Sequence, residues 1–306
     1  MVLKLSQAIN GFLLSCRARG LSPNTILDYK RTVNKLLSHL GDVPLPSIIR
    51  ADVEHFLSSQ TGVSNKTLLN YYIGLSAMMT WAVNEKVIKR NIVRELQPPR
   101  PEIRAIDPYT QEEIRRLIAA VSRSKDYTRP SKVRSSHSLG SAARMRAILL
   151  MLLDTGLRAS ELCDLRVMDV DVDSGKIILK GKGGKERRVE FGHRTGQALW
   201  RYLAERGELR GDEPLIVGRT GNGLDHRDLY HRVAELGKRA GVSDVHPHRF
   251  RHTFAIQYLR NGGDAYTLQA LLGHSTMEMV RRYLKLAQVD LEAAHRRASP
   301  VENWRL

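Results

Sequence analysis

Five short clusters of polar side chains have the residue types needed for chemistry on a phosphate group. They combine arginine, lysine and histidine, which donate hydrogen bonds to anionic oxygens, with a tyrosine whose hydroxyl can act as a nucleophile. In sequence order they are TGLRASEL at 155–162, GKGGKERR at 181–188, HRFRH at 248–252, LLGHS at 271–275 and RRY at 281–283. Each cluster taken singly is ambiguous.

The arginines and the tyrosine also have structural interpretations. Arg158 follows an apolar stretch and a glycine, so it is either a surface charge or a fixed anion clamp. His248 and Arg251 lie one helical turn apart, where both can donate to one anion near a helix N-terminus. Tyr283 follows Met279 by four residues, and this spacing by itself favours a core aromatic residue.

Neither a metal site nor a nucleotide site is predicted. His248 and His252 are four residues apart, but no acidic residue stands between them in the H-E-x-x-H manner. Cys16 and Cys163 are not spaced for zinc and lie in apolar helical patterns, so we expect reduced thiols. Lys182 lies in a glycine-rich turn that lacks the G-x-x-x-x-G-K-S/T sequence of a P-loop. We therefore expect no metal and no other cofactor.

The chain is strongly basic. Its 49 Lys and Arg residues exceed its 32 Asp and Glu residues by 17, and the sequence pI is about 10.1. Residues 1–100 carry 13 basic and 6 acidic side chains, so the excess is not confined to one tail. An extended polyanion such as DNA is the natural partner, with a solvated basic surface as the alternative. A membrane fits less well, since no apolar run of about 18 residues occurs.

The N-terminal segment and the first half of the chain predict helices only. Residues 1–16 have the apolar and polar mix of an amphipathic helix rather than of a signal peptide, so we expect a cytoplasmic protein. Ser22 is a good N-cap and Pro23 a good first helical residue for the next helix. A long helix over about 65–84 and a shorter one over 51–58 complete a compact four-helix unit.

A proline-rich stretch separates this unit from the rest. The sequence QPPRP at 97–101 cannot continue a helix, because proline lacks the backbone donor and biases the preceding residue to extended geometry. We therefore predict a helical domain over 1–96, a linker over 97–107 and a second domain over 108–306.

The second domain predicts helices around one short hairpin. A capping box at 110–113 begins a helix, and residues 122–141 form a basic loop that we expect to be mobile and to which we assign no role. The nearly continuous apolar pattern at 142–154 is typical of a central buried helix. The remaining predicted elements are strands over 176–180 and 186–191 around a turn at 181–185, and helices over about 195–205, 225–240, 248–261, 264–272 and 275–284.

The order Arg, Lys, His-x-x-Arg, Gly-His and Tyr, with Tyr283 nine residues after His274, resembles the tyrosine recombinase (integrase) family and its Xer/Cre-like two-domain members. The resemblance covers nearly the whole chain, although in the first domain it rests on architecture and the Ser-Pro-Asn-Thr helix start. It implies a mainly α-helical fold with a small β-sheet. A four-helix, SAM-like core-binding domain would precede a mixed α/β catalytic domain.

The same resemblance implies catalytic roles. Six positions match the paired arginines, the hairpin lysine, the two histidines and the nucleophilic tyrosine of the family. They are Arg158 and Arg251, Lys182, His248 and His274, and Tyr283. Glu161 matches the acidic residue that supports the site.

These roles imply DNA strand exchange without metal or ATP. Two guanidiniums offset the phosphate charge and the further charge that gathers in the transition state. Tyr283 attacks to form a covalent 3′-phosphotyrosine, with His248 as proton acceptor and Lys182 as proton donor to the departing 5′ oxygen. His274 donates to a nonbridging oxygen. A 5′ hydroxyl from another strand reverses the step, so we expect a site-specific DNA recombinase or integrase.

Assemblies of the family are tetramers on paired inverted DNA sites, so the resemblance implies a homotetramer on double-stranded DNA and a monomer or weak oligomer when free. The segment about 285–306 is expected to dock on a neighbouring subunit, with packing on its own domain as an equal alternative.

Two other functions share part of this pattern. A type IB topoisomerase would share the chemistry, and a noncatalytic DNA-binding protein would share only the charge and the helices. Lys66, Asn70 and Arg249 are our candidates for reading bases. The sequence predicts neither the target site nor the choice between integration or excision of a mobile element and resolution of replicon dimers.

Overall fold

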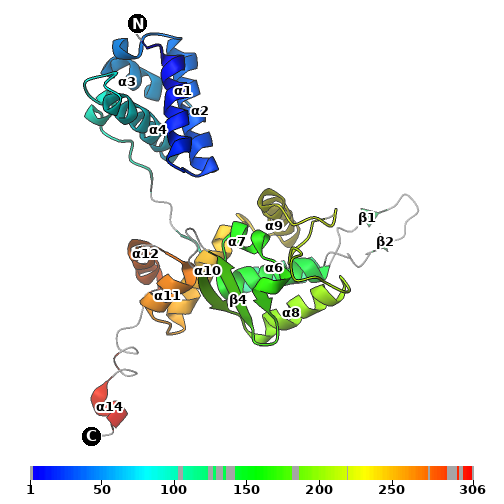
Figure 1. Ribbon diagram of the computed structural model, residues 1–306. Coiled ribbons are helices and arrows are strands. Elements are labelled where there is room, and N and C mark those ends of the chain that lie inside the picture. The colour runs from blue at the N-terminus through cyan, green and yellow to red at the C-terminus, as the bar shows by residue number, and fades with distance from the viewer. Residues whose placement is uncertain are drawn as a thin grey trace. The chain divides into compact units, whose positions relative to one another are not determined.

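The computed structural model describes residues 3–102, 106–122, 127–128, 134–135, 142–180, 186–218, 220–274, 276–287, 295 and 299–304. The chain divides into two compact units, Met1–Arg104 and Ala105–Leu306 (Figure 1). The division falls inside the segment 97–107 that its prolines predict to be a linker. Each unit has an apolar core of its own. No helix among the described residues is long and apolar enough to cross a membrane.

Residues 3–102 of the first unit form four α-helices and two short 3-10 helices. Ser22 and Ser64 cap the two longest helices by accepting hydrogen bonds from the backbone N–H groups of Thr25 and Thr67, which otherwise lack partners. The helices are α1 (Leu5–Ala18), α2 (Pro23–Leu40), η1 (Leu45–Ser47), α3 (Arg50–Ser58), α4 (Asn65–Asn84) and η2 (Ile92–Glu95). Large side chains that are fully buried between them include Phe12, Leu36, Phe56, Leu75, Met78 and Met79.

The second unit is built around the buried helix α6 (Ala142–Thr155), which packs against three other helices. Ile148, Met151 and Leu152 of α6 have no exposed surface. The helices in contact with it are α5 (Gln111–Val121), α8 (His193–Ala204) and α10 (Pro247–Arg260). The other helices described are α7 (Ala159–Asp164), η3 (Val167–Asp169), α9 (His226–Ala240), α11 (Ala265–Leu272), α12 (Glu278–Ala287) and α14 (Pro300–Trp304).

A small antiparallel sheet packs onto these helices in the order β3 (Val170–Asp171), β4 (Lys176–Lys180), β5 (Glu186–Glu190). Burial alternates along β4, with Ile177 and Leu179 facing the core. Leu179 pairs with Arg187 across the ladder, so the Arg187 side chain also lies on the inward face. The predicted hairpin is confirmed, but its turn at 181–185, which contains Lys182, lies outside the described residues.

The basic segment 122–141 contains regular structure that the sequence did not indicate. Two short strands, β1 (Tyr127–Thr128) and β2 (Arg134–Ser135), pair antiparallel with Tyr127 opposite Ser135. The segment was predicted to be a mobile basic loop, and no strand was predicted at these four residues. Most of the remaining residues of the segment lie outside the described part of the chain.

A second apolar cluster in this unit joins α10, α11 and α12, which gather at one end of the unit (Figure 1). Helix α12 begins at Glu278, three residues later than its pattern predicts. The cluster buries Ile256 and Leu259 of α10 against Leu268 and Val280, and it includes Tyr283 itself. Tyr283 is therefore part of the core, as its spacing indicates, and also part of the cluster of polar groups described next.

Candidate active site

Arg158 is positioned by the tight end of helix α6. Gly156 has a φ of +62°, and a Cβ added there would overlap the ring of Phe254, so glycine is required. The turn makes Arg158 the N-cap residue of α7. Its backbone N–H donates to Glu161 Oε2 at 2.8 Å, and its Nη1 donates to Glu161 Oε1 at 2.7 Å.

Glu161 connects this arginine to a second one that the sequence interpretation missed. Arg187 of β5 donates from Nη2 to Glu161 Oε2 at 2.7 Å and from Nε to the carbonyl oxygen of Leu271 at 3.1 Å. Burial by itself raises the pKa of the Glu161 carboxyl, but hydrogen bonds from Arg187 and from the Arg158 backbone outweigh it and lower the pKa to about 2. Glu161 is therefore a permanent anion between two guanidiniums. In the sequence, the alternation along the strand that places Arg187 on its inward face was the signal that could have identified this arginine as part of the site.

Arg251 is the most deeply buried charged side chain among the described residues, with 1% of its surface exposed. Its guanidinium donates to the carbonyl oxygens of Gly156 at 2.7 Å and Leu272 at 2.6 Å, which ties the ends of α6 and α11 together. Burial, followed by the charge of Arg158, lowers the pKa of Arg251 to about 10, so it remains a cation at neutral pH. Two fixed cations therefore converge on one place.

His274 follows α11 and contacts Arg251, whose Nη2 lies 3.0 Å from His274 Nε2. A guanidinium has no acceptor, so Nε2 must accept and the ring proton must be on Nδ1. Burial, followed by Arg251 and Arg158, lowers the pKa of His274 to about 4, which keeps the ring neutral at pH 7. The Nδ1 atom is buried and has no hydrogen-bond partner among the described residues. An unpaired buried donor costs about 1–3 kcal/mol, and an anionic oxygen would satisfy it.

Tyr283 of α12 completes this cluster, with 1% of its surface exposed. Its ring stacks beside that of His274, with centroids 6.3 Å apart and planes at 14°. Its hydroxyl lies 2.8 Å from Nδ1 of His252. Burial raises the pKa of Tyr283, although the charges of Arg251 and Arg158 oppose the rise, so the free protein holds a phenol rather than a phenolate.

The histidine that hydrogen-bonds the Tyr283 hydroxyl is His252, not His248, which the sequence interpretation named as the proton acceptor. His248 was expected to accept the tyrosine proton, but its ring packs edge to face on His252, with centroids 4.8 Å apart. Burial, followed by His248, lowers the pKa of His252 to about 4. The four-residue spacing of these histidines placed both on one face of α10, and this was the signal for a second imidazole in the site.

Comparison with known proteins identifies the family to which this arrangement belongs. The family model described as "Phage integrase family" matches residues 109–289, which is more than half of the chain. The chain belongs to this family. A second model, "Phage integrase, N-terminal SAM-like domain", matches residues 9–86 and confirms the predicted type of the first domain. This integrase family member is a site-specific tyrosine recombinase, an enzyme that breaks and rejoins DNA strands.

Relatives along the whole chain agree with this assignment. Tyrosine recombinase XerA of Thermococcus kodakarensis is 30% identical over 303 residues, covering 97% of both chains. Tyrosine recombinase XerC of Salmonella typhi is 30% identical over 291 residues, covering 92% of both chains. A crystal structure of XerA recombinase is 27% identical, covers 96% of this chain and 99% of that one, and has a TM-score of 0.51.

A further solved structure shows the same fold. The Tn1549 transposon integrase in complex with transposon right end DNA is 21% identical to this chain. The match covers 97% of this chain and 100% of that one, with a TM-score of 0.74. The fold expected from the resemblance, a helical SAM-like domain followed by a catalytic domain with a small sheet, is therefore confirmed.

Arg249 of this recombinase is not placed to read bases, which corrects our expectation. Its side chain is 7% exposed and its Nη2 pairs with Asp107 at 2.9 Å and Glu113 at 3.1 Å. The guanidinium also lies 4.1 Å from the ring centroid of Tyr109. One position after His248, the side chain points to a different face of α10 and holds α10 to the start of α5.

The structure describes two of the three remaining predicted site residues. Lys66 and Asn70 lie exposed on α4 of the first unit, as a surface role requires. Lys182 lies outside the described residues. The structure brings together Arg158, Arg251, His274 and Tyr283 within the second unit, with Glu161, Arg187 and His252 as their supports and neighbours.

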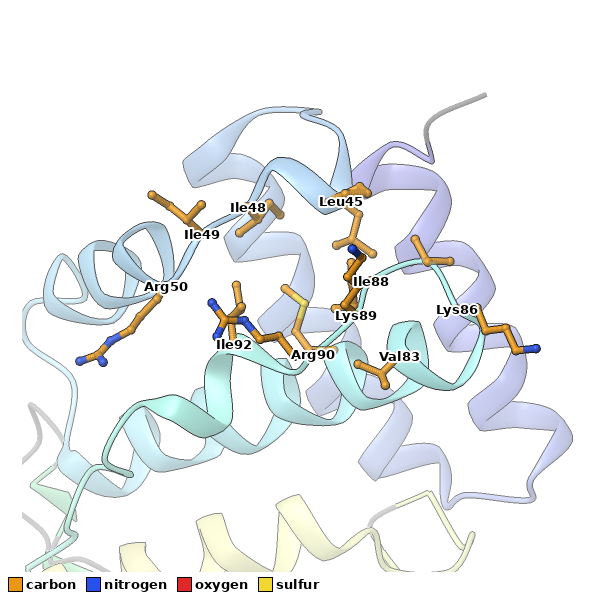
Figure 2. A pocket seen from close by; sticks show the side chains of 13 residues that line it. Leu45, Ile48, Ile49, Arg50, Val83, Lys86, Ile88, Lys89, Arg90 and Ile92 are labelled. Carbon is orange, nitrogen blue, oxygen red and sulfur yellow. The ribbon is translucent and has the colours of Figure 1, made fainter.

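A pocket of about 770 Å³ in the first unit does not belong to this group of residues. It lies between residues 45–50, the end of α4 and the segment 86–92 (Figure 2). Apolar side chains such as Ile48, Ile88 and Ile92 line it, together with basic groups that include Arg50 and Lys89. The lining contains no carboxylate, thiol or imidazole, and its ionisable side chains are Arg50, Lys86, Lys89 and Arg90.

Proposed function

We propose that Tyr283 is the nucleophile with which this recombinase cuts DNA. Its hydroxyl oxygen attacks a backbone phosphorus, a covalent 3′-phosphotyrosine forms, and a 5′ hydroxyl leaves. The new bond retains the free energy of the cut strand, so a 5′ hydroxyl from another strand can rejoin it without ATP. The observation that carries the proposal is a buried tyrosine whose hydroxyl contacts an imidazole in a site with two buried or half-buried guanidiniums.

The two arginines and His274 form the cradle for the phosphate. Arg158 and Arg251 are held by Glu161 and by backbone carbonyl groups, so they are in position before DNA arrives. Preorganised charges of this kind favour the transition state, in which the phosphate gathers further negative charge. The unpaired Nδ1–H of His274 supplies a donor for a nonbridging oxygen.

Proton transfer is the second requirement of the reaction. Making a phenolate from an ordinary tyrosine at pH 7 costs about 4 kcal/mol, and burial of Tyr283 adds to this cost. The nearby guanidiniums offset part of it. The departing 5′ oxygen needs a proton, and Lys182 in the hairpin turn is the group that we assign to deliver it.

A nicked suicide substrate tests the proposal. When cleavage releases a short 5′ fragment that diffuses away, the covalent adduct accumulates and is visible on a denaturing gel. We expect adduct in the presence of EDTA, and we expect Tyr283→Phe to abolish it while binding DNA with unchanged affinity. Tyr258→Phe is the matched control, because it removes the hydroxyl of a half-buried tyrosine on α10 that hydrogen-bonds Thr267. An adduct that still forms with Tyr283→Phe would contradict the assignment.

The partner that we propose is double-stranded DNA with paired inverted sites. The solved relatives include XerH recombinase bound to palindromic difH substrate and a lambda integrase dimer bound to a COC′ core site. The net charge of +17 favours the same partner here. We further propose that four copies assemble on two such sites, that the free chain is a monomer or weak oligomer, and that it acts in the cytoplasm. Native mass spectrometry with and without a selected DNA site tests the stoichiometry.

A type IB topoisomerase activity would use the same covalent step. It predicts relaxation of any supercoiled plasmid, whereas the recombinase predicts strand exchange that depends on a particular site. Comparing relaxation rates on plasmids with and without a selected site separates the two, and equal relaxation of both would favour the topoisomerase.

A further inference from the structure

His252 contacts the hydroxyl oxygen of Tyr283, and no function has so far been assigned to this histidine. Nδ1 of His252 lies 2.8 Å from the tyrosine hydroxyl, and the two rings are 5.6 Å apart. Among the described residues, no other side chain hydrogen-bonds this hydroxyl. A distance of 2.8 Å is within the usual range of a hydrogen bond from a hydroxyl donor. The nucleophile is therefore already held by one imidazole before DNA binds.

We propose that His252 is a catalytic residue, whose Nδ1 accepts the hydrogen bond of the Tyr283 hydroxyl in the free protein and takes its proton during attack. The proposal rests on Tyr283 being the nucleophile. As the tyrosine oxygen bonds to phosphorus, the bond from phosphorus to the 5′ oxygen breaks, and that oxygen leaves with the electron pair and receives a proton from Lys182. The phenol proton ends on His252. In rejoining, His252 returns it to the tyrosine oxygen.

Geometry favours His252 over His248 for this role. His248 lies one helical turn earlier, and its ring centroid is 4.8 Å from that of His252, whereas His252 itself contacts the hydroxyl. A proton acceptor must be within about 2.6–3.2 Å of the atom that releases the proton. Only His252 meets this requirement among the described residues. His248 is left free to contact the phosphate, as its position one turn before Arg251 allows.

The protonation states of the free protein are the ones that the proposal needs. Burial, followed by His248, keeps the pKa of His252 at about 4, so the ring is neutral at pH 7 and Nδ1 can offer a lone pair. Burial likewise raises the pKa of Tyr283 and keeps its proton in place. The titratable and charged groups that act on His252 or contact it are His246, His248 and Arg251 of α10 and its cap, His274 after α11, and Tyr283 of α12.

Binding of the phosphate is expected to raise the pKa of His252, which makes it a better proton acceptor. Arg251 lowers the pKa of His252, and a phosphodiester seated on Arg251 and Arg158 brings a negative charge that opposes this effect. His252 then becomes a stronger base at the moment when the phosphorus is in reach. The phenol stays protonated and unreactive when the site holds no phosphate, so activation of the nucleophile depends on substrate.

Two substitutions separate proton transfer from packing. His252→Asn places an amide near the position of Nδ1 and can still hydrogen-bond the hydroxyl, but it has no basic nitrogen. His252→Phe keeps a planar ring and removes both functions. Tyr258→Phe on the same helix is the matched control, because its hydroxyl bonds Thr267 outside the constellation. Each variant is measured as the full chain for its thermal midpoint, its DNA affinity and its single-turnover rate of adduct formation on the suicide substrate.

We expect both His252 variants to form adduct about 100-fold or more slowly at pH 7, as is typical for loss of a general base, with DNA affinity unchanged within about twofold. Their rates should rise with pH between about 7 and 9, because hydroxide replaces the missing base, while the rate of the unsubstituted protein changes little. If His252→Phe does not fold, His252→Asn carries the test. His252→Asn that reacts at the original rate with the original pH profile overturns the proposal.

A sulfur-substituted DNA distinguishes the base from the acid. When the leaving 5′ oxygen is replaced by sulfur, the departing thiolate needs no proton, so the substrate bypasses the acid but not the base. Lys182→Ala should recover on this substrate, and the His252 variants should not. Recovery of His252→Asn would assign His252 to the leaving group and overturn the proposal. An unsubstituted protein that forms no adduct on either substrate would instead refute Tyr283 as the nucleophile.

Discussion

Substituting Glu161 by Gln tests how Arg158 is held in position. The carboxylate binds Arg158 through Oε1 and Arg187 through Oε2, each at 2.7 Å, and its side chain is 17% exposed. Glutamine keeps the shape of the side chain, but its amide NH2 group cannot accept a hydrogen bond from a guanidinium. One of the two arginines therefore loses its partner, and both lose the neutralising charge.

The pKa of Glu161 sets the size of the expected loss. It falls from 4.5 in an ordinary glutamate to about 2, because the hydrogen bonds from Arg187 and the Arg158 backbone outweigh the opposing effect of burial. The whole shift corresponds to about 3 kcal/mol of folding free energy, and screening at the exposed edge reduces this to about 2 kcal/mol. In a unit of about 200 residues, this loss lowers the melting temperature by roughly 4–8 °C.

The pH dependence has a definite sign. The folded carboxyl has a lower pKa than the unfolded one, so the unfolded chain binds more protons between about pH 4.5 and pH 2. The stabilisation is complete above this range and is lost as the pH falls through it. The difference in melting temperature between the two proteins should therefore be constant from about pH 7 to pH 5.5 and should shrink towards pH 3.

Differential scanning calorimetry at several pH values measures these quantities, and the transition of the first unit serves as an internal reference because that unit has its own core. Asp212→Asn is the matched control. Its ion pair with Arg210 has a distance of 2.9 Å, but both side chains are more than half exposed, so we expect a change within about 0.5 kcal/mol. A Glu161→Gln protein that melts with the unsubstituted one at pH 7, or a difference that widens in acid, would refute the reasoning.

Three further predictions follow from single contacts. Arg249→Met should destabilise the second unit by about 1–3 kcal/mol, because it removes the cation paired with the Glu113 carboxylate, whose side chain is 16% exposed. Site preference in a DNA-binding selection should stay unchanged, and an altered preference would restore a base-reading role. Gly156→Ala should lower the free energy of unfolding of the second unit by about 1–3 kcal/mol and slow adduct formation, because the residue has a φ of +62° and the added methyl group overlaps Phe254. An unchanged thermal midpoint would contradict this. Lys66→Ala should weaken binding to a selected site by about 1–3 kcal/mol and binding to random DNA much less, as measured by fluorescence anisotropy; equal losses on both would make Lys66 a phosphate contact.

Local sequence patterns were sufficient to predict most of the helices and strands. The helix starts at Ser22 and Thr110 depend on capping hydrogen bonds within three residues. The hairpin depends on alternating apolar and polar residues around a glycine-rich turn. Each of these features can therefore be recognised in a short stretch of sequence. The order of the polar clusters was also sufficient to select four side chains that the structure brings together: Arg158, Arg251, His274 and Tyr283.

The sequence by itself determined the family, the elements and the residue types of the site, because these depend on short spacings and on the order of motifs. Only the tertiary structure decided which side chains meet. Arg187 reaches Glu161 across 26 residues, His252 reaches Tyr283 across 31, and Arg249 reaches Asp107 across 142. Helical spacing cannot encode such pairs, since it describes one face of one helix and not what packs against it. For this reason Arg249 was predicted to face DNA and proved to be buried, while His252 was considered only as a metal ligand and proved to hold the tyrosine.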